Sequence, residues 1–156
     1  MIALDIPGLG NYVLTDLVLD INGTLSVDGT LLPGVATRCR DLAEVVDIHL
    51  LTADMRGTAA GIAEELGVRW TRVRPGGEAE QKGLFVQELG GHNVIAIGNG
   101  HNDAEMLATA GLGIAVLGAE GTSVRALMQA DLAVADICTA LDLLLHPTRI
   151  VATLRN

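Results

Sequence analysis

The first candidate for chemistry is a carboxylate that follows an apolar run. Leu17–Leu19 leads directly into Asp20, which is followed by Ile, Asn, Gly and Thr at positions 21–24. An aspartate at the carboxyl end of a strand, beside a flexible glycine, is suited to in-line attack on phosphorus. It can take a phosphoryl group as an acyl phosphate, which divides one difficult hydrolysis into two easier steps. In isolation, the same residues also fit a tight turn at Asn22-Gly23 beside a solvated aspartate.

A hydroxyl group follows the next apolar run in the same way. Ile48–Leu51 leads into Thr52, which could donate a hydrogen bond to a phosphate oxygen, and Ala53 and Asp54 come next. Asp54 precedes a predicted helix, and a helix N-cap is the better interpretation of its side chain.

Lys82 is a charged residue in an unusual position. It lies near the beginning of a predicted helix at Glu78–Leu89. A cation near a helix N-terminus opposes the helix dipole, so an anion or nearby carboxylates are expected to compensate it. The alternative is an exposed lysine, which is the commoner situation.

The loop Gly98–Asp103 carries the second strong signal. The apolar run Val94–Ile97 opens into Gly-Asn-Gly-His-Asn-Asp and then into a predicted helix. Asp103 can serve a magnesium ion, which prefers oxygen ligands in octahedral array and retains several waters. Two alternatives remain open. One is a helix cap at Asn102 or Asp103, and the other is a dinucleotide-binding fingerprint, which is weak because the third glycine is absent.

In this order along the chain, the motifs resemble the haloacid dehalogenase superfamily. Within it they are most similar to the phosphorylation domain of P-type ATPases and to its small soluble relatives that lack a cap domain. The resemblance spans about residues 17–134, and four motifs in the same order argue against coincidence. The matching segments are Asp20-x-Asn22-Gly-Thr24, Thr52, Lys82 and Gly98-Asn99-Gly100-x-Asn102-Asp103.

The resemblance implies a role for each matching residue. The implied catalytic residues are Asp20 as the nucleophile, Asn22 and Lys82. The implied ligands of Mg²⁺ are Asp20, the main-chain carbonyl of Asn22, Asn99 and Asp103, which would bind or orient the metal and its waters. The implied phosphate contacts are Thr52, Ala53, Lys82 and Gly23. Thr24 and Asn102 are implied to support the two loops.

Asn22 departs from the pattern of most phosphatases in this superfamily. Its position is usually an aspartate that protonates the leaving group and later activates water, and an amide cannot exchange protons in this way. Such general acid–base help is typically worth about 10²–10⁴-fold. We therefore expect slow turnover, a restriction to good leaving groups, or accumulation of the aspartyl phosphate.

Asn99 is the second departure, because the ATPase-like loop has an acidic metal ligand there. An amide oxygen can still coordinate Mg²⁺, but the affinity should fall unless Asp103 and the phosphate compensate. Metal binding is then expected to depend on substrate. His101, in the same loop, could replace the missing general acid, although a loop histidine is more often exposed to solvent.

Length, composition and charge limit the classes of function. A chain of 156 residues with 49% hydrophobic and 19% charged residues supports one well-buried domain, residues 1–156. The net charge of −9 argues against nucleic-acid and anionic-membrane partners, and no apolar run approaches the roughly 20 residues that span a bilayer. Without a secretory signal, we expect a soluble cytoplasmic protein in which Cys39 and Cys138 are packing residues.

The elements that must position these residues alternate between strand and helix. The predicted strands are Leu17–Leu19, Val46–Leu51, Val94–Ile97, Leu112–Val116 and Leu132–Val134. The predicted helices are Val35–Val45, Arg56–Leu66, Glu78–Leu89, Asp103–Ala110, Thr122–Gln129 and Ile137–Leu145. This alternation predicts an α/β fold of three layers, Rossmann-like, with a mostly parallel sheet covered by helices on both faces. Ligands of such sheets bind outside the carboxyl ends of the strands.

Short connections between the motifs leave no room for a cap domain. Residues 1–16 are expected to form a leading hairpin and residues 25–33 a flap, so that the site is open. The sequence shows neither the nucleotide-binding insertion nor the membrane helices of the ATPases, so we expect no ATP-driven ion transport. An open site is expected to act on a phosphorylated small molecule or macromolecule, or to be closed by assembly into a homo-oligomer.

These observations favour a Mg²⁺-dependent phosphatase or phosphotransferase that works through an aspartyl phosphate. The alternative is a non-catalytic regulatory module that binds phosphate and metal on the same fold. A nucleotide-binding Rossmann-like domain ranks last, because neither a complete glycine fingerprint nor a ribose-binding acid is present.

Overall fold

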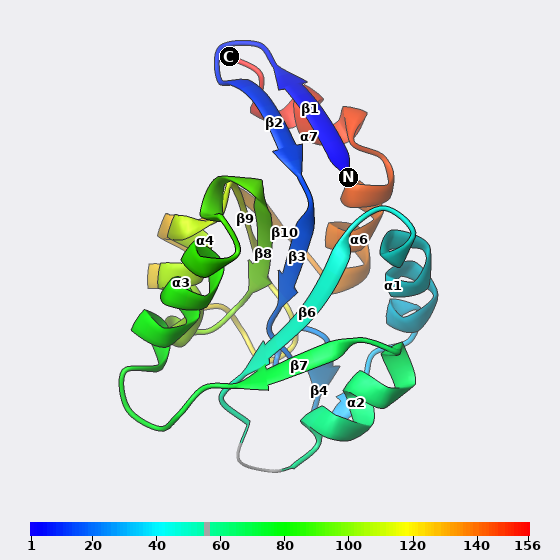
Figure 1. The fold of residues 1–156 in the computed structure, drawn as a ribbon, viewed down its shortest axis with the longest axis vertical. Helices are drawn as coiled ribbons and strands as arrows, with labels where there is room; N and C mark the ends of the chain where they lie inside the picture. The colour runs from blue at the N-terminus through cyan, green and yellow to red at the C-terminus, as the bar shows by residue number, and fades with distance from the viewer. Residues whose placement is uncertain (55–56) are drawn as a thin grey trace.

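The apolar runs of the sequence form the strands of a six-stranded parallel sheet (Figure 1). The computed structural model describes residues 1–54 and 57–156. The strands of the sheet, in chain order, are β3 (Asp16–Leu19), β6 (Asp47–Thr52), β7 (Arg69–Arg72), β8 (Val94–Gly98), β9 (Leu112–Val116) and β10 (Leu132–Val134). Their order across the sheet is β10-β9-β8-β3-β6-β7, and every neighbouring pair is parallel.

Five of these strands confirm the predicted ones, and β7 was not predicted. Its sequence, Arg-Trp-Thr-Arg, contains no apolar run, and all four residues are exposed. β7 lies at the edge of the sheet beside β6, where polar side chains can remain in water.

The helices follow the predicted order, with shifted ends. They are α1 (Val35–Ala43), α2 (Ala59–Leu66), α3 (Glu78–Glu88), α4 (Ala104–Thr109), α5 (Val124–Gln129), α6 (Ile137–Leu145) and α7 (Thr148–Leu154), with short 3-10 helices at Gly91–Asn93 and His101–Asp103. The second predicted helix starts at Arg56, which lies outside the described residues. Helix α7 was not predicted, and Pro147 precedes its first residue, a position at which proline is compatible with a helix start.

Helices cover both faces of the sheet, which gives the predicted three layers (Figure 1). Because successive strand residues point to opposite faces, each buried strand serves two apolar clusters. In β3, Leu17 and Leu19 pack in the larger cluster with α1, α2 and α6, whereas Val18 packs in the smaller cluster with α3, α4 and α5. Cys39 is buried in the larger cluster and Cys138 packs against it, as predicted for packing residues.

The chain changes direction across the sheet at β3. From β3 it continues to β6 and β7 on one side, and it then returns to β8, β9 and β10 on the other side. The Asp20 amide donates to the Ile97 carbonyl at 3.0 Å, so β3 and β8 stay paired up to their carboxyl ends. This switch in strand order creates the crevice in which ligands of parallel α/β sheets bind.

Two small hairpins flank the sheet. β1 (Ile2–Ile6) and β2 (Gly10–Leu14) pair antiparallel and extend from the body of the molecule, with α7 packed against β1 (Figure 1). β4 (Ser26–Val27) and β5 (Thr30–Leu31) form the second hairpin, directly after the Asp20 loop. Its turn residues Asp28 and Gly29 both have positive φ, at 51° and 80°, as a two-residue hairpin turn requires.

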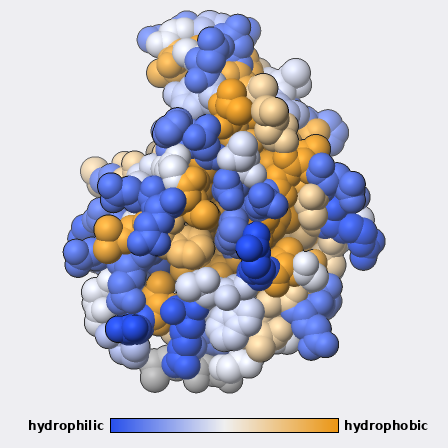
Figure 2. Space-filling view, viewed as in Figure 1, coloured by the Kyte–Doolittle hydropathy of each residue, from blue (hydrophilic) through white to orange (hydrophobic). Residues whose placement is uncertain are grey.

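Polar and apolar side chains are interspersed over the face seen in Figure 2. Within residues 1–54 and 57–156, no single helix is long and apolar enough to cross a membrane. Helices α6 and α7 taken together reach the length and apolar composition of a membrane span, but the two helices are bent by 106°.

Candidate active site

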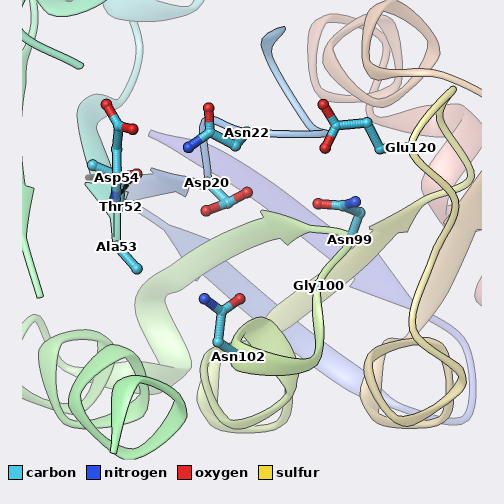
Figure 3. Close-up of a pocket in the computed structure, with 9 residues that line it drawn as sticks. All are labelled: Asp20, Asn22, Thr52, Ala53, Asp54, Asn99, Gly100, Asn102 and Glu120. Atoms are coloured by element: carbon cyan, nitrogen blue, oxygen red, sulfur yellow. Dashed lines mark hydrogen bonds between the residues drawn. The ribbon is translucent and has the colours of Figure 1, made fainter. Parts of the chain in front are cut away.

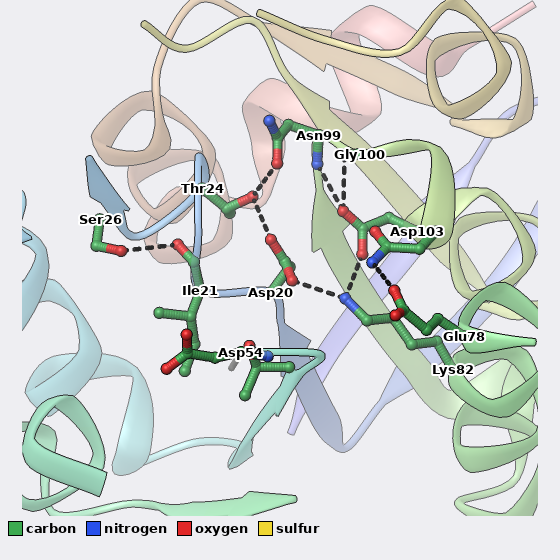
Figure 4. A network of polar contacts seen from close by, with 12 residues as sticks. Asp20, Ile21, Thr24, Ser26, Asp54, Glu78, Lys82, Asn99, Gly100 and Asp103 are labelled. Carbon is green, nitrogen blue, oxygen red and sulfur yellow. Dashed lines mark hydrogen bonds and ion pairs between the residues drawn. The ribbon is translucent and has the colours of Figure 1, made fainter. Parts of the chain in front are cut away.

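A buried lysine joins the two carboxylates that follow β3 and β8. Lys82 Nζ donates to Asp20 Oδ1 and to Asp103 Oδ1, each at 2.7 Å, and its side chain has no exposed surface (Figure 4). The carboxylates therefore compensate the cation near the start of α3, as expected. Asp20, Lys82 and Asp103 are called the floor cluster below.

The Gly98–Asp103 loop folds around the second carboxylate. Asp103 Oδ2 accepts hydrogen bonds from the amides of Asn99 at 3.0 Å and Gly100 at 2.8 Å. Asp103 is fully buried, and both of its oxygens are engaged within the protein. In this arrangement, Asp103 fixes Lys82 and the loop that carries Asn99.

The floor cluster contains two carboxylates and one cation, which perturbs the ionisation of its members. Burial, and then the nearby charge of Asp103, raise the pKa of Asp20 to about 7 against the opposing effect of Lys82. Burial by itself would lower the pKa of Lys82, but the charges of Asp20 and Asp103 outweigh it and raise that pKa. Lys82 therefore stays protonated, whereas Asp20 can change its protonation state near neutral pH.

Thr24 links the nucleophile loop to the Gly98–Asp103 loop. Its hydroxyl lies 3.3 Å from Asp20 Oδ2 and 3.1 Å from Asn99 Oδ1, and its single proton can be donated to either oxygen. This contact agrees with the supporting role predicted for Thr24. Asn102, the other predicted supporting residue, donates from Nδ2 to Glu78 Oε2 at 2.9 Å and so joins the loop to the start of α3.

A cavity of about 350 Å³ lies over the exposed side of Asp20 (Figure 3). Its lining residues come from the ends of β3, β6 and β8 and from the loop after β9. They are Asp20, Asn22, Thr52, Ala53, Asp54, Asn99, Gly100, Asn102 and Glu120. The residues Asn22, Asn99 and Glu120 are called the rim below.

The loop after β6 forms one wall of this cavity. Thr52 is buried, and its Oγ1 accepts a hydrogen bond from the Asp54 amide at 3.0 Å. Asp54 Oδ2 accepts from the amides of Thr58 at 2.9 Å and Ala59 at 3.3 Å, at the start of α2. Asp54 therefore binds the first amides of α2, although the N-cap residue of this helix is Thr58 and not Asp54. Asp54 also lines the cavity, which the sequence analysis did not foresee, next to Ala53, which it had assigned to phosphate binding.

Gly23 has a different position from the one predicted. Its amide donates to the Ser26 carbonyl at 2.8 Å, and the residue lines a second cavity behind the first. Its φ is 78°, and a Cβ atom there would lie 2.5 Å from Asn99 Nδ2 and 2.9 Å from Glu120 Oε2. The absence of a side chain thus allows the rim to close against the nucleophile loop, instead of offering the Gly23 amide to a phosphate.

Two further outcomes concern candidate proton donors. His101 is exposed and is not among the residues that line the cavity, so the structure gives no support for it as the missing acid. Glu120, which the sequence analysis missed, does line it. No motif surrounds Glu120 in the sequence, and only the folding of residues 117–123 against Gly23 brings it to the site.

The sequence itself matches a known family. A sequence model of haloacid dehalogenase-like hydrolases matches residues 3–111. The chain belongs to this family. The expected relationship is thus confirmed, as is the α/β fold of the family.

Relatives of this hydrolase include transport ATPases and an uncharacterised protein. The protein MJ0073 of Methanocaldococcus jannaschii is 43% identical over 89 residues, which cover 54% of this chain and 96% of that protein. A probable copper-transporting ATPase, HMA5 of Arabidopsis thaliana, is 32% identical over 138 residues, which cover 84% of this chain. The match covers 14% of that ATPase, so the hydrolase spans only a small part of such a transporter.

Solved structures of haloacid dehalogenase-like proteins have the same fold. A zinc-transporting PIB-type ATPase in its E2.Pi state superposes with a TM-score of 0.66 and 31% identity over 80% of this chain and 20% of that chain. The 3-deoxy-D-manno-octulosonate 8-phosphate phosphatase from Moraxella catarrhalis superposes with a TM-score of 0.68 and 17% identity, covering 91% of this chain and 94% of that chain.

The donor atoms around Asp20 are those that Mg²⁺ prefers. The Asp20 carboxylate and the Asn99 side-chain oxygen line the cavity, as does Asn22. Within the described ranges, no group of three or more His, Cys, Asp and Glu residues is placed to hold a metal ion. A site with one or two carboxylates and neutral oxygen donors fits Mg²⁺, which keeps several water ligands, better than it fits a metal that requires a full protein cage.

Proposed function

We propose that this hydrolase transfers a phosphoryl group from a phosphorylated substrate to Asp20 and then to water, with Mg²⁺ as its cofactor. The observation that carries the proposal is the buried Lys82, which lies 2.7 Å from both Asp20 and Asp103 at the point where the strand order reverses. Two carboxylates and a cation are costly to bury, so their presence here favours a catalytic purpose over a structural one.

The residues present account for the chemistry in two steps. In the first, an Asp20 carboxylate oxygen forms a bond to phosphorus while the bond between phosphorus and the leaving group breaks, and the leaving oxygen keeps the electron pair. In the second, a water oxygen attacks phosphorus, the bond to Asp20 breaks, and inorganic phosphate leaves. In this proposal, Thr52 at the cavity wall and the positive charge of Lys82 beneath Asp20 would stabilise the phosphoryl oxygens.

Mg²⁺ would be held by Asp20, by Asn99 and by the main-chain carbonyl of Asn22, with Asp103 orienting the loop. When bound, it would neutralise the charge of the phosphate as that group approaches the Asp20 carboxylate. The cavity needs such a charge, because its ionisable lining residues, Asp20, Asp54 and Glu120, are all acidic.

Asn22 restricts the substrate in this proposal. An amide cannot protonate a leaving group, so acyl and aryl phosphates, whose leaving groups depart as stable anions, should react first. The structural neighbours support a phosphorylated substrate in general terms. The Moraxella phosphatase was solved with a magnesium ion, a phosphate ion and KDO, and the zinc ATPase was solved in its E2.Pi state.

The test is a comparison of the wild type with Asp20→Asn and Asp47→Asn. Asp47 is exposed at the opposite end of the sheet, so it controls for the loss of an aspartate elsewhere. With Mg²⁺ and acetyl or aryl phosphate, we expect phosphate release and a covalent phosphoryl adduct in the wild type and in Asp47→Asn. Asp20→Asn should show neither by colorimetric phosphate assay or by intact mass.

A phosphate- and metal-binding module without turnover is the second candidate, and the amides at Asn22 and Asn99 favour it. Binding of Mg²⁺ or phosphate by calorimetry, with no release and no adduct for any substrate in the wild type, would replace the catalytic proposal by this one.

A further inference from the structure

The loop between β9 and α5 brings a carboxylate to the cavity over Asp20. Glu120 lies in this loop, and Figure 3 shows its carboxylate directed toward the cavity, on the same side of Asp20 as Asn22. Asn22 occupies the position at which a general acid is missing. Of the three described ionisable residues that line the cavity, Asp20 is paired with Lys82 and Asp54 binds the start of α2, so Glu120 is the candidate for proton transfer.

Close packing holds this loop against the Asp20 loop. The site of a Cβ atom on Gly23 would be 2.9 Å from Glu120 Oε2, so the carboxylate lies against the backbone that follows Asp20. A Cβ atom on Gly118 would lie 3.2 Å from the Gly23 carbonyl oxygen, which shows that the two backbones are also in contact. A glycine at both positions allows this approach.

Hydrogen bonds fasten the loop on both sides of Glu120. Asn99 Nδ2 donates to the Gly121 carbonyl at 2.9 Å, and the Ser123 amide donates to the Asn99 carbonyl at 2.8 Å. The Thr122 hydroxyl donates to the Val116 carbonyl at 2.6 Å. An aspartate at position 99 would have no donor for Gly121, so the amide at this position serves the loop that carries Glu120.

We infer that Glu120 is a catalytic residue, which donates a proton to the leaving group and then accepts one from the attacking water, in place of an aspartate at position 22. The inference rests on the proposed function. As the bond between phosphorus and the leaving oxygen breaks, that oxygen takes the electron pair and the Glu120 carboxyl proton. The Glu120 carboxylate then takes a proton from water, whose oxygen bonds to phosphorus as the bond to Asp20 breaks. Asp20, phosphate and protonated Glu120 result.

Other charged groups do not hold Glu120 in a structural role. Within the described part of the chain, the ion pairs join Arg38 to Asp142, His49 to Asp16, Arg125 to Glu105, and Lys82 to Asp20 and Asp103, so none of them involves Glu120. The residue is exposed, which leaves its carboxyl group free to exchange protons with solvent between turnovers.

Leaving-group dependence tests the inference. Glu120→Gln should lower the hydrolysis of an alkyl phosphate, whose leaving group needs a proton, by about 10²–10⁴-fold. Formation of the phosphoryl adduct from acetyl phosphate should change little, because an acetate leaving group needs no proton. The adduct should persist longer in Glu120→Gln than in the wild type, as followed by intact mass. Glu44→Gln, an exposed change at the opposite end of the sheet, should behave as the wild type does.

Rescue by a second variant separates a catalytic role from a structural one. Adding Asn22→Asp to Glu120→Gln should restore alkyl phosphate hydrolysis at least tenfold, because it returns an acid to the usual position. Three outcomes would overturn the role of Glu120 and leave the proposed function standing. They are equal losses with acyl and alkyl phosphates in Glu120→Gln, unchanged rates in Glu120→Gln, and a wild type that releases phosphate from acyl but never from alkyl phosphates. If no substrate gives a reaction that depends on Asp20, the proposed function fails and the role of Glu120 with it.

Discussion

The floor cluster and the rim of the same cavity hold their polar groups in opposite ways. Asp20, Lys82 and Asp103 are buried, and short ion pairs fix their side chains to one another. In the rim, Asn99 is buried as well, whereas the carboxylate of Glu120 is exposed and lies in the loop between β9 and α5. The difference suggests that attack on phosphorus depends on the core of the fold, whereas the departure of the leaving group depends on a surface loop.

Removing the cation of the floor cluster should have the largest effect on stability. Lys82→Met leaves two buried carboxylates without a cationic partner, and breaking a buried ion pair in this way costs about 3–5 kcal/mol. We expect a loss of this size in the free energy of unfolding, measured by urea denaturation.

The matched control is Arg38→Met, which also removes a cation paired with a carboxylate. Arg38 binds Asp142 at 2.7 Å, but the two side chains are 30% and 35% exposed, so the loss should be about 1 kcal/mol or less. Similar losses for the two variants would contradict the distinction between a buried floor cluster and the surface.

A methyl group at Gly23 should disturb the rim and leave the floor cluster paired. Gly23→Ala places a Cβ atom 2.5 Å from Asn99 Nδ2 in a backbone of φ 78°, which combines steric overlap with a disfavoured conformation. We expect a loss of about 2–3 kcal/mol by thermal or chemical denaturation.

Gly67→Ala separates these two causes. Gly67 has a similar φ of 67°, but no atom lies within 4 Å of the site of its Cβ atom. Its substitution should cost only about 1 kcal/mol, from the backbone conformation alone. Equal costs at Gly23 and Gly67 would show that the contact of the rim with the nucleophile loop contributes nothing to stability.

The effect of neutralising the nucleophile on stability should depend on pH. The pKa of Asp20 is raised to about 7 by burial and by Asp103, above its ordinary value of 3.8. Folding therefore disfavours the ionised form, and the stability of the wild type should fall as the pH rises from about 4 to 7 and then level off. Asp20→Asn lacks this change.

The measurement is urea denaturation of both proteins across this pH range, in the presence of a chelator. Asp20→Asn should match the wild type at pH 4 and exceed it by up to about 4 kcal/mol at pH 8, because one unit of pKa shift corresponds to about 1.4 kcal/mol. A difference that stays constant with pH would mean that Asp20 keeps an ordinary pKa in the metal-free protein.

The floor cluster and the two amides of the rim, Asn22 and Asn99, could be anticipated from the sequence, whereas Glu120 could not. Asp20, Thr52 and Asp103 each follow an apolar run, and parallel strands bring such residues together at one edge of the sheet. The pairing of Lys82 with both aspartates could not be predicted, because it depends on how α3 packs against the sheet. Helical periodicity gives no information on which side chains from different elements come into contact. The roles assigned to these residues in metal and phosphate binding stay predictions.

Glu120 illustrates what local patterns cannot show. An acidic residue between glycines looks like any surface turn, and only the fit of residues 117–123 against Gly23 gives it a place at the cavity. β7 was missed for a related reason, since an exposed edge strand of Arg-Trp-Thr-Arg has no buried face to impose an apolar pattern.

Lys82 is the only lysine of the chain, and its side chain has no exposed surface. An amine-acylating reagent added to the folded protein should therefore spare the side chain of Lys82. Labelling at Lys82 requires an opening of the structure around α3, so its rate reports on the local unfolding of that region. Lys82 is thus a single chemical probe, at the centre of the site, for local unfolding of the protein.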